Sequence, residues 1–312
     1  MPALSALSPL SNTPPADYVG RFAPSPTGPL HMGSLVSALA SYLHAHTASG
    51  KWLVRMEDLD PPREQHGAAD AILRSLEDHG LHWDGQVVYQ SQRLAAYEEV
   101  LHYLRAQDLV YPCNCTRQDL QQMGGVYNGR CRTRKVDVHQ PHALRLKLYD
   151  LPRKHSTEQL VFTDLIQGRQ QQQLRTQVGD QILRRKDGLF AYQLAVVVDD
   201  IAQQITHIIR GADLLEVSAR QIFLFELLDA PPPEYGHVPL VMNEQGQKLS
   251  KQNMAPPLES TKAGHNLWRA LHFLAQKPPQ ELNNADVDEV LCWAKAHWQL
   301  ERVSDPYSPE SD

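Results

Sequence analysis

The sequence has no apolar run that approaches the roughly 20 residues needed for a membrane-spanning helix. Its first 17 residues, MPALSALSPLSNTPPAD, lack the basic segment and continuous apolar core of a signal peptide, so a cytoplasmic location is expected. Four cysteines are too few for a disulfide scaffold. The formal net charge of −6 argues against a protein whose whole surface is basic and binds nucleic acid.

What the sequence does contain is an alternation of β-type and α-type segments. Strands are predicted at residues 18–23, 51–56, 193–198, 205–209 and 237–242. Helices are predicted at residues 35–46, around 72–80, at 94–109 and 218–228, and after residue 257. This alternation is typical of an α/β fold in which helices flank a parallel sheet.

The pattern also suggests how the chain divides into domains. Residues 18–110 and 190–255 are predicted to be the two halves of the sheet domain, interrupted by an inserted domain at residues 111–189. Residues 1–17 are predicted to be a flexible arm, because they are rich in serine and proline. Residues 256–312 are predicted to be a short helical region with a frayed tail.

Two loops have the composition of a phosphate-binding site. The first is PSPTGPLHMGS, in which prolines stiffen a strand-to-helix turn and Gly28 and Gly33 allow close approach of a ligand. His31 can donate a hydrogen bond to a phosphate there. The second is KLSKQ, in which Lys248 and Lys251 flank a serine on a glycine-containing loop. Either loop alone is most simply a surface loop, but together they predict a clamp for a polyphosphate.

Three of the four cysteines are close together, in the pattern C-x-C-x₁₁-Y-x₃-C. Cys113, Cys115 and Cys131 lie within 19 residues of a loop rich in polar side chains, which suits a structural, tetrahedral zinc site. The fourth ligand is left open between Tyr127, His139 and His142. The alternative is three buried free thiols.

The order and spacing of several motifs resemble a known family. PSPTGPLHMGS and KLSKQ resemble the HIGH and KMSKS regions of class I aminoacyl-tRNA synthetases. RFAPSPTGPLHMGS, RMEDLD, LHWDG, YQSQR and FAYQLAVVVDD…THIIRGADLL are similar to glutamyl-tRNA synthetases. Only about sixty residues follow Lys251, too few for a large anticodon-binding region, so the chain resembles a truncated branch, the glutamyl-Q tRNA(Asp) synthetases.

This resemblance implies a Rossmann-type parallel sheet and an ATP-dependent ligase without a covalent enzyme nucleophile. The enzyme would activate L-glutamate without tRNA and attach it to the queuosine base in the anticodon loop of tRNA(Asp). Mg²⁺ with ATP, one structural zinc held with Tyr127 as fourth ligand, and a monomeric state are also expected. Two alternatives remain: a glutamyl-tRNA synthetase that charges a tRNA 3′ end, and a catalytically silent paralogue that binds glutamate or RNA.

The resemblance also implies roles for individual residues. Three are expected to be catalytic: His31, Lys248 and Lys251. The ATP site would contain these three with Pro24, Gly28, Gly33, Ser34 and Ser250. The glutamate site would contain Arg21, Phe22, Ala23, Pro24, Ser25, Glu57, Tyr192 and Arg210. Arginine suits a carboxylate ligand because its planar fork binds both oxygens.

Two basic runs leave a choice open. The first contains Arg130, Arg132, Arg134 and Lys135, and the second contains residues 184–186. Each is either a solvated surface or a contact for RNA phosphates.

Overall fold

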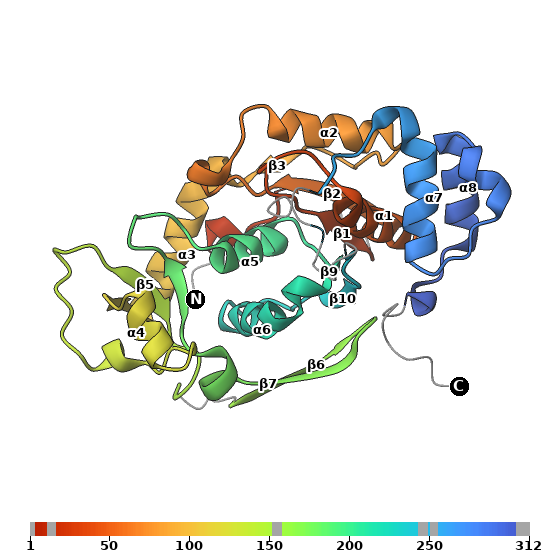
Figure 1. Ribbon diagram of the computed structural model, residues 1–312. Helices are drawn as coiled ribbons and strands as arrows, with labels where there is room; N and C mark the ends of the chain where they lie inside the picture. Colours follow the sequence, from red (N-terminus) through yellow and green to blue (C-terminus); the bar gives the residue numbers. More distant parts are fainter. Residues whose placement is uncertain (1–3, 11–16, 152–157, 243–248, 250–254, 304–312) are drawn as a thin grey trace.

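A computed structural model describes residues 4–10, 17–151, 158–242, 249 and 255–303 (Figure 1). Two sheets with parallel strands lie at its centre. The first has the order β1 (Val19–Phe22), β2 (Lys51–Met56) and β3 (Val88–Tyr89), all parallel. The second has the order β7 (Gly168–Gln173), β6 (Gln159–Asp164), β10 (Glu234–Val238) and β9 (His207–Gly211).

The two sheets meet where β1 lies beside the start of β9. The backbone N–H of Thr206 donates to the carbonyl oxygen of Val19 at 2.9 Å. Within the second sheet, β10 is parallel to both β6 and β9. The predicted parallel sheet is therefore confirmed, and the carboxyl ends of β1, β2, β9 and β10 lie at one edge.

Helices cover both faces of this central layer, so consecutive residues of β1, β9 and β10 are buried, including the polar side chains of Arg21, Arg210 and His237. One core cluster packs the sheet against α3 (Leu94–Ala106), α5 (Tyr192–Ala202) and α6 (Ser218–Leu227). The other packs it against α1 (Met32–Thr47), α2 (Ala68–Asp78), α7 (Ala263–Phe273) and α8 (Val287–His297). In Figure 1 the C-terminal helices α7 and α8 lie beside α1, so this region completes the core of the N-terminal half.

Two strand predictions are wrong. Residues 193–198 form part of helix α5, in which the side chains from Leu194 to Asp200 are all buried. A short apolar run that is buried on every side has no periodicity to distinguish helix from strand. Residues 237–242 were expected to be a strand, but β10 ends at Val238. Pro239, which follows, has no N–H to donate to a ladder.

The predicted insertion contains two parts with different attachments. Strands β4 (Val110–Cys113), β5 (Ala143–Leu146) and β8 (Gln181–Arg184) form a separate antiparallel sheet, close to the short helix α4 (Arg117–Gln122). The hairpin β6–β7 instead extends the second central sheet, because Asp164 pairs with Tyr235 of β10. A segment within the predicted insertion thus belongs to one of the central sheets.

Within the predicted flexible arm of residues 1–17, the described residues 4–10 pack against the core, so for this part the prediction is wrong. Residues Ser5–Leu7 form a single 3₁₀ turn, and Ala6 is buried in the core. The backbone N–H and hydroxyl of Ser5 both donate to the carboxylate of Glu99 on α3, at 2.8 and 2.6 Å. Residues 11–16 and the tail beyond residue 303 lie outside the described residues. Over the described ranges, every helix is too short or too polar to span a membrane.

Candidate functional site

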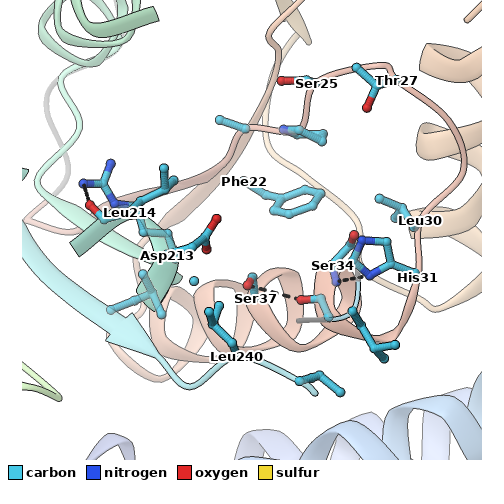
Figure 2. Close-up of a pocket in the computed structure, with 18 of the residues that line it drawn as sticks. Phe22, Ser25, Thr27, Leu30, His31, Ser34, Ser37, Asp213, Leu214 and Leu240 are labelled. Carbon is cyan, nitrogen blue, oxygen red and sulfur yellow. Dashed lines mark hydrogen bonds between the residues drawn. The ribbon is translucent and has the colours of Figure 1, made fainter. Parts of the chain in front are cut away.

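A cavity of about 280 Å³ lies at the carboxyl ends of β1 and β9, facing the start of α1 (Figure 2). Figure 2 shows Phe22 in its middle, with His31 and Ser34 on one side and Asp213 and Leu214 on the other. Open α/β sheets bind ligands at this edge. The cavity collects ten of the sequence-predicted residues: Arg21, Phe22, Ala23, Pro24, Ser25, His31, Gly33, Ser34, Tyr192 and Arg210.

The geometry of His31 fixes its tautomer. His31 is the N-cap of α1, and its Nδ1 accepts a hydrogen bond from the backbone N–H of Ser34 at 3.3 Å. Because Nδ1 acts as the acceptor, the neutral ring carries its proton on Nε2. A Cβ on Gly33 would lie only 3.2 Å from His31 Cε1, so glycine leaves the ring in place. His31 therefore presents an N–H donor at the positive end of a helix.

Leu249 is the residue of the KLSKQ loop that the structure describes. Leu249 lines the same cavity, and its carbonyl oxygen lies 3.7 Å from the position that a Cβ on Gly33 would occupy. Its N–H donates to the carbonyl oxygen of Val241 at 2.7 Å. Lys248, Ser250 and Lys251 lie outside the described residues. The described part of the loop and the histidine loop thus meet at one site.

Two predicted residues stand next to the cavity without lining it. Gly28 has a φ of 139°, a conformation that residues with a side chain rarely adopt, so it serves the turn before His31. Glu57 directly follows β2, and its backbone N–H donates to the carbonyl oxygen of Pro24 at 3.0 Å. This bond ties the loop after β1 to the end of β2.

Arg210, on β9, is held from one side only. Its Nε donates to His237 Nε2 at 2.9 Å, and its Nη2 donates to the hydroxyl of Ser218 at 2.9 Å and to the carbonyl of Leu214 at 3.2 Å. Over the described part of the chain, its Nη1 is buried and has no hydrogen-bond partner. Leaving a buried guanidinium N–H unpaired is costly. Since Arg210 lines the cavity, the arrangement suits an anionic ligand.

Arg21, on β1, is already paired within the protein. Its Nε and Nη2 donate to the two carboxylate oxygens of Asp200 on α5, at 3.3 and 3.4 Å. The same carboxylate lies 2.8 Å from Nη1 of Arg55, a fully buried arginine on β2. Asp200 therefore fixes the guanidinium of Arg21 through Nε and Nη2, and its Nη1 is not part of this pairing.

Burial raises the pKa values of two predicted residues, Glu57 and Tyr192. It raises the pKa of Glu57 to about 7, although the nearby Arg55 and Arg21 guanidiniums act to lower it. The Arg55 Nη2 to Glu57 Oε1 distance is 3.5 Å. Burial likewise raises the pKa of Tyr192 to about 12, so its phenol is protonated at neutral pH. A carboxylate and a neutral hydroxyl are both able to accept from an ammonium group.

Sequence reasoning missed the partners that hold the predicted residues. Asp200, Arg55, Ser218 and His237 are all buried and contact Arg21, Glu57 or Arg210. Asp200 and Arg55 lie within motifs already quoted, VVVDD and RMEDLD, and charged residues in such apolar surroundings were the available signal. His237 had no such signal. Asp213, in THIIRGADLL, also lines the cavity.

The three clustered cysteines form a second site, in the insertion. Their sulfur atoms all lie within 4.8 Å of one another, and Cys115 and Cys131 are 3.5 Å apart, too far for a disulfide. Tetrahedral zinc with Zn–S bonds of about 2.3 Å places its thiolates just under 4 Å apart. Three thiols at this spacing fit a metal ion with a preference for sulfur ligands.

Tyr127 contributes an oxygen to the same cluster. Its hydroxyl lies 3.4 Å from Cys113 Sγ and 3.9 Å from Cys115 Sγ. The guanidinium of Arg145 stacks 3.8 Å above its ring, a positive charge that favours anionic ligands. His139 is exposed, His142 is half-buried with its Nδ1 2.9 Å from the carbonyl oxygen of Gln140, and no described histidine belongs to the cluster.

The basic runs are largely occupied by bonds within the protein. Arg132 donates to Asp180 at 2.6 Å, and Arg130 donates to Asp119 at 2.7 Å. In the second run, Arg184 pairs with Glu98, Arg185 with Asp187, and Lys186 donates to a backbone carbonyl. Arg134 and Lys135 are exposed. Ion pairs and hydrogen bonds within the protein therefore occupy most of the charged side chains in the two basic runs.

Comparisons with known proteins agree with this geometry. Residues 18–263 match the family described as tRNA synthetases class I (E and Q), catalytic domain. The chain is 52% identical over 286 residues to the Glutamyl-Q tRNA(Asp) synthetase of Serratia proteamaculans, covering 92% of each chain. It is 50% identical over 286 residues to the protein of that name from Ectopseudomonas mendocina, covering 92% of this chain and 95% of the relative.

A solved structure shows the same fold. The crystal structure of a glutamate tRNA ligase from Elizabethkingia meningosepticum, in complex with its amino acid, superposes with a TM-score of 0.75 at 24% identity. The match covers 93% of this chain but 66% of that one, whereas the relatives above are matched over nearly their whole length. By its motifs, its fold and its relatives, the chain belongs to the glutamyl-Q tRNA(Asp) synthetases of the class I tRNA synthetase family.

Proposed function

We propose that this protein activates glutamate with ATP and transfers the glutamyl group to queuosine in the anticodon loop of tRNA(Asp). The observation that carries the glutamate assignment is the unpaired, buried Nη1 of Arg210 beside the cavity. The names of the relatives supply the acceptor. The chain matches these relatives over 95% and 92% of their length but matches 66% of the glutamate tRNA ligase, which favours this acceptor over a tRNA 3′ end.

The glutamate side chain would be held between the two arginines. Arg210 Nη1 and Arg21 Nη1 are the guanidinium nitrogens that remain after the bonds to His237, Ser218 and Asp200. The ammonium group would lie against ionised Glu57 and the hydroxyl of Tyr192. Such a site rejects glutamine, because its amide would place N–H groups against guanidinium donors.

Activation then requires positioning and charge stabilisation. An oxygen of the glutamate α-carboxylate attacks the α-phosphorus of ATP, and the bond to pyrophosphate breaks. The Nε2–H of His31 and the N-terminal end of α1 are suited to stabilise negative charge on the phosphates. Lys248 and Lys251 are proposed to hold the pyrophosphate, with Ser250 between them. Mg²⁺ bound with ATP supplies further charge neutralisation.

The silent-paralogue alternative has less support. A protein that only senses glutamate or RNA has no need for a histidine N-cap beside the KLSKQ loop, yet Leu249 and Gly33 lie together at the cavity. We further propose that Cys113, Cys115, Cys131 and Tyr127 hold one zinc ion that stabilises the insertion. A cytoplasmic monomer, as expected from the sequence, remains a prediction.

The proposal is tested by ATP–pyrophosphate exchange with glutamate and no RNA, followed by transfer assays. We expect exchange with glutamate alone, and transfer to tRNA(Asp) that contains queuosine but not to the same tRNA without it. Exchange that depends on tRNA, with charging of a 3′ end, would favour the ordinary glutamyl enzyme. Absence of both activities would identify a silent paralogue.

A further inference from the structure

His237 connects the proposed glutamate clamp to the hairpin β6–β7. It lies on β10, is fully buried, and contacts a different residue through each ring nitrogen. Nδ1 is 2.5 Å from Oδ2 of Asp164, at the end of β6. Nε2 is 2.9 Å from Nε of Arg210 and 3.2 Å from the hydroxyl oxygen of Ser218, which itself accepts from Nη2 of Arg210. The three residues form a continuous chain from the insertion to the cavity.

The direction of these hydrogen bonds follows from the donors and acceptors. The guanidinium of Arg210 can only donate, so His237 Nε2 must be without a proton and accept. The ring then carries its proton on Nδ1 and donates it to the Asp164 carboxylate. A proton on Nε2 would place two donors against each other. Asp164 therefore selects the tautomer that Arg210 needs, as a carboxylate that accepts from one ring nitrogen of a histidine does in other proteins.

Asp164 is itself held in place by the backbone. Its Oδ1 accepts from three N–H groups: those of Ile166 at 3.0 Å, Gln167 at 2.8 Å and His237 at 3.1 Å. Its Oδ2 is thereby directed at the imidazole. Because one oxygen serves the turn and the other serves His237, the two roles can be separated by substitution.

We propose that His237, oriented by Asp164, is a positioning residue that holds the Arg210 guanidinium for glutamate. This rests on the proposed role of Arg210 as the carboxylate clamp. Nε and Nη2 of Arg210 are fixed by His237 and Ser218, which leaves Nη1 as the group available to the ligand. Losing the Nε2 acceptor would free the guanidinium to rotate and would weaken glutamate binding without touching ATP.

The sharpest test is Asp164→Asn. The asparagine Oδ1 can keep the three backbone N–H bonds, which places its NH₂ group against His237 Nδ1. That nitrogen must then accept, and the ring proton moves to Nε2, facing Arg210. We expect the KM for glutamate in pyrophosphate exchange to rise at least 10-fold, with the KM for ATP and kcat within about 3-fold of wild type.

Two substitutions of His237 form the matched pair. In His237→Asn the amide occupies the position of Nδ1 and leaves nothing at Nε2, so a similar rise in glutamate KM is expected. In His237→Gln the amide oxygen can reach the Nε2 position and accept from Arg210, so the rise should be under about 3-fold. Asp164→Asn added to His237→Gln should have no further effect, because the tautomer no longer exists.

The outcomes separate this inference from the proposed function. The positioning role of His237 is overturned if Asp164→Asn leaves the KM for glutamate unchanged or if the KM values for ATP and glutamate rise equally. It is also overturned if the KM for glutamate rises as much in His237→Gln as in His237→Asn. Should His237→Asn not fold, as judged by thermal melting, the isosteric Asp164→Asn decides alone. A wild-type protein without glutamate-dependent exchange would instead refute the proposed function.

Discussion

The cavity and the cysteine cluster are assembled over different distances along the chain. In the cluster, Cys115 and Cys131 are 16 positions apart, and Tyr127 is 14 positions from Cys113. At the cavity, Arg21 pairs with Asp200 across 179 positions. The insertion brings its ligands together within one loop region, whereas the cavity depends on strands and helices from the whole catalytic half.

The two sites also differ in what they leave unsatisfied. The three sulfur atoms of the cluster lie within 4.8 Å of one another and the Tyr127 hydroxyl is 3.4 Å from Cys113 Sγ, so all four groups could be satisfied together by one bound metal ion. At the cavity, His237 and Ser218 accept hydrogen bonds from Nε and Nη2 of Arg210, and Nη1 is left for a ligand. The comparison indicates that a substrate site keeps a hydrogen-bond donor unpaired for its ligand, whereas a structural metal site holds its ion permanently and leaves no such donor.

The largest effect is expected from substitution of Arg210. Arg210→Ala should raise the KM for glutamate by about 10³-fold, because removing one partner of a buried, hydrogen-bonded charge pair is strongly unfavourable. The KM for ATP should change little. Arg210→Lys keeps the charge but lacks the planar fork, and should recover part of the loss. Pyrophosphate exchange at varied glutamate and ATP gives both constants. A selective loss of ATP affinity would contradict the assignment of Arg210.

The other end of the cavity should respond in kcat. His31→Ala is expected to lower the rate of pyrophosphate exchange by about 10²–10³-fold, as does loss of one preorganised donor in other enzymes. The KM for glutamate should stay within about 3-fold. His31→Gln, whose amide N–H can reach the position of Nε2, should restore part of the rate. An unchanged rate in a folded His31→Ala variant would remove this residue from the chemistry.

A smaller effect should follow from the pKa of Glu57, which burial raises to about 7. The ionised carboxylate accepts the substrate ammonium, so affinity is present above this pKa and is lost as the pH falls through it. Between pH 8 and pH 6 the ionised fraction drops from about nine-tenths to about one-tenth, and the KM for glutamate should rise about 10-fold. In Glu57→Gln the KM should be high and independent of pH over this range. A wild-type profile that is flat would contradict the role.

The contrast between local and distant contacts also decides what the sequence could predict. The strands at residues 51–56 and 205–209 and the helix at 218–228 follow from period and turn residues, and the structure has β2, β9 and α6 there. Helix α5 was mistaken for a strand because its apolar residues are buried on all sides. The helix is buried by α3, α6 and the sheet, and the sequence of the helix itself does not show these contacts.

The same holds for the candidate sites. Cys113, Cys115 and Cys131 could be found by spacing alone, because their geometry is set within one loop region. Arg21 and Arg210 could be found by resemblance to motifs. Asp200 could be suspected only as a charged residue that follows an apolar run, and His237 could not be found at all, because a pairing across the fold leaves its partner unnamed in the local sequence.

The smallest effect on activation is expected from loss of the proposed metal, since none of the clustered cysteines is among the residues that line the cavity. Cys131→Ser should lower bound zinc from one to well below one per chain, while glutamate-dependent exchange changes by less than about 3-fold. Cys292→Ser, at an exposed cysteine on α8, is the matched control and should retain full zinc content. Tyr127→Phe keeps the ring beneath Arg145 and removes only the oxygen, so reduced zinc affinity in this variant would identify the fourth ligand. If exchange fell as steeply in Cys131→Ser as in Arg210→Ala, the two sites would be coupled, and the division between a structural and a substrate site would be wrong.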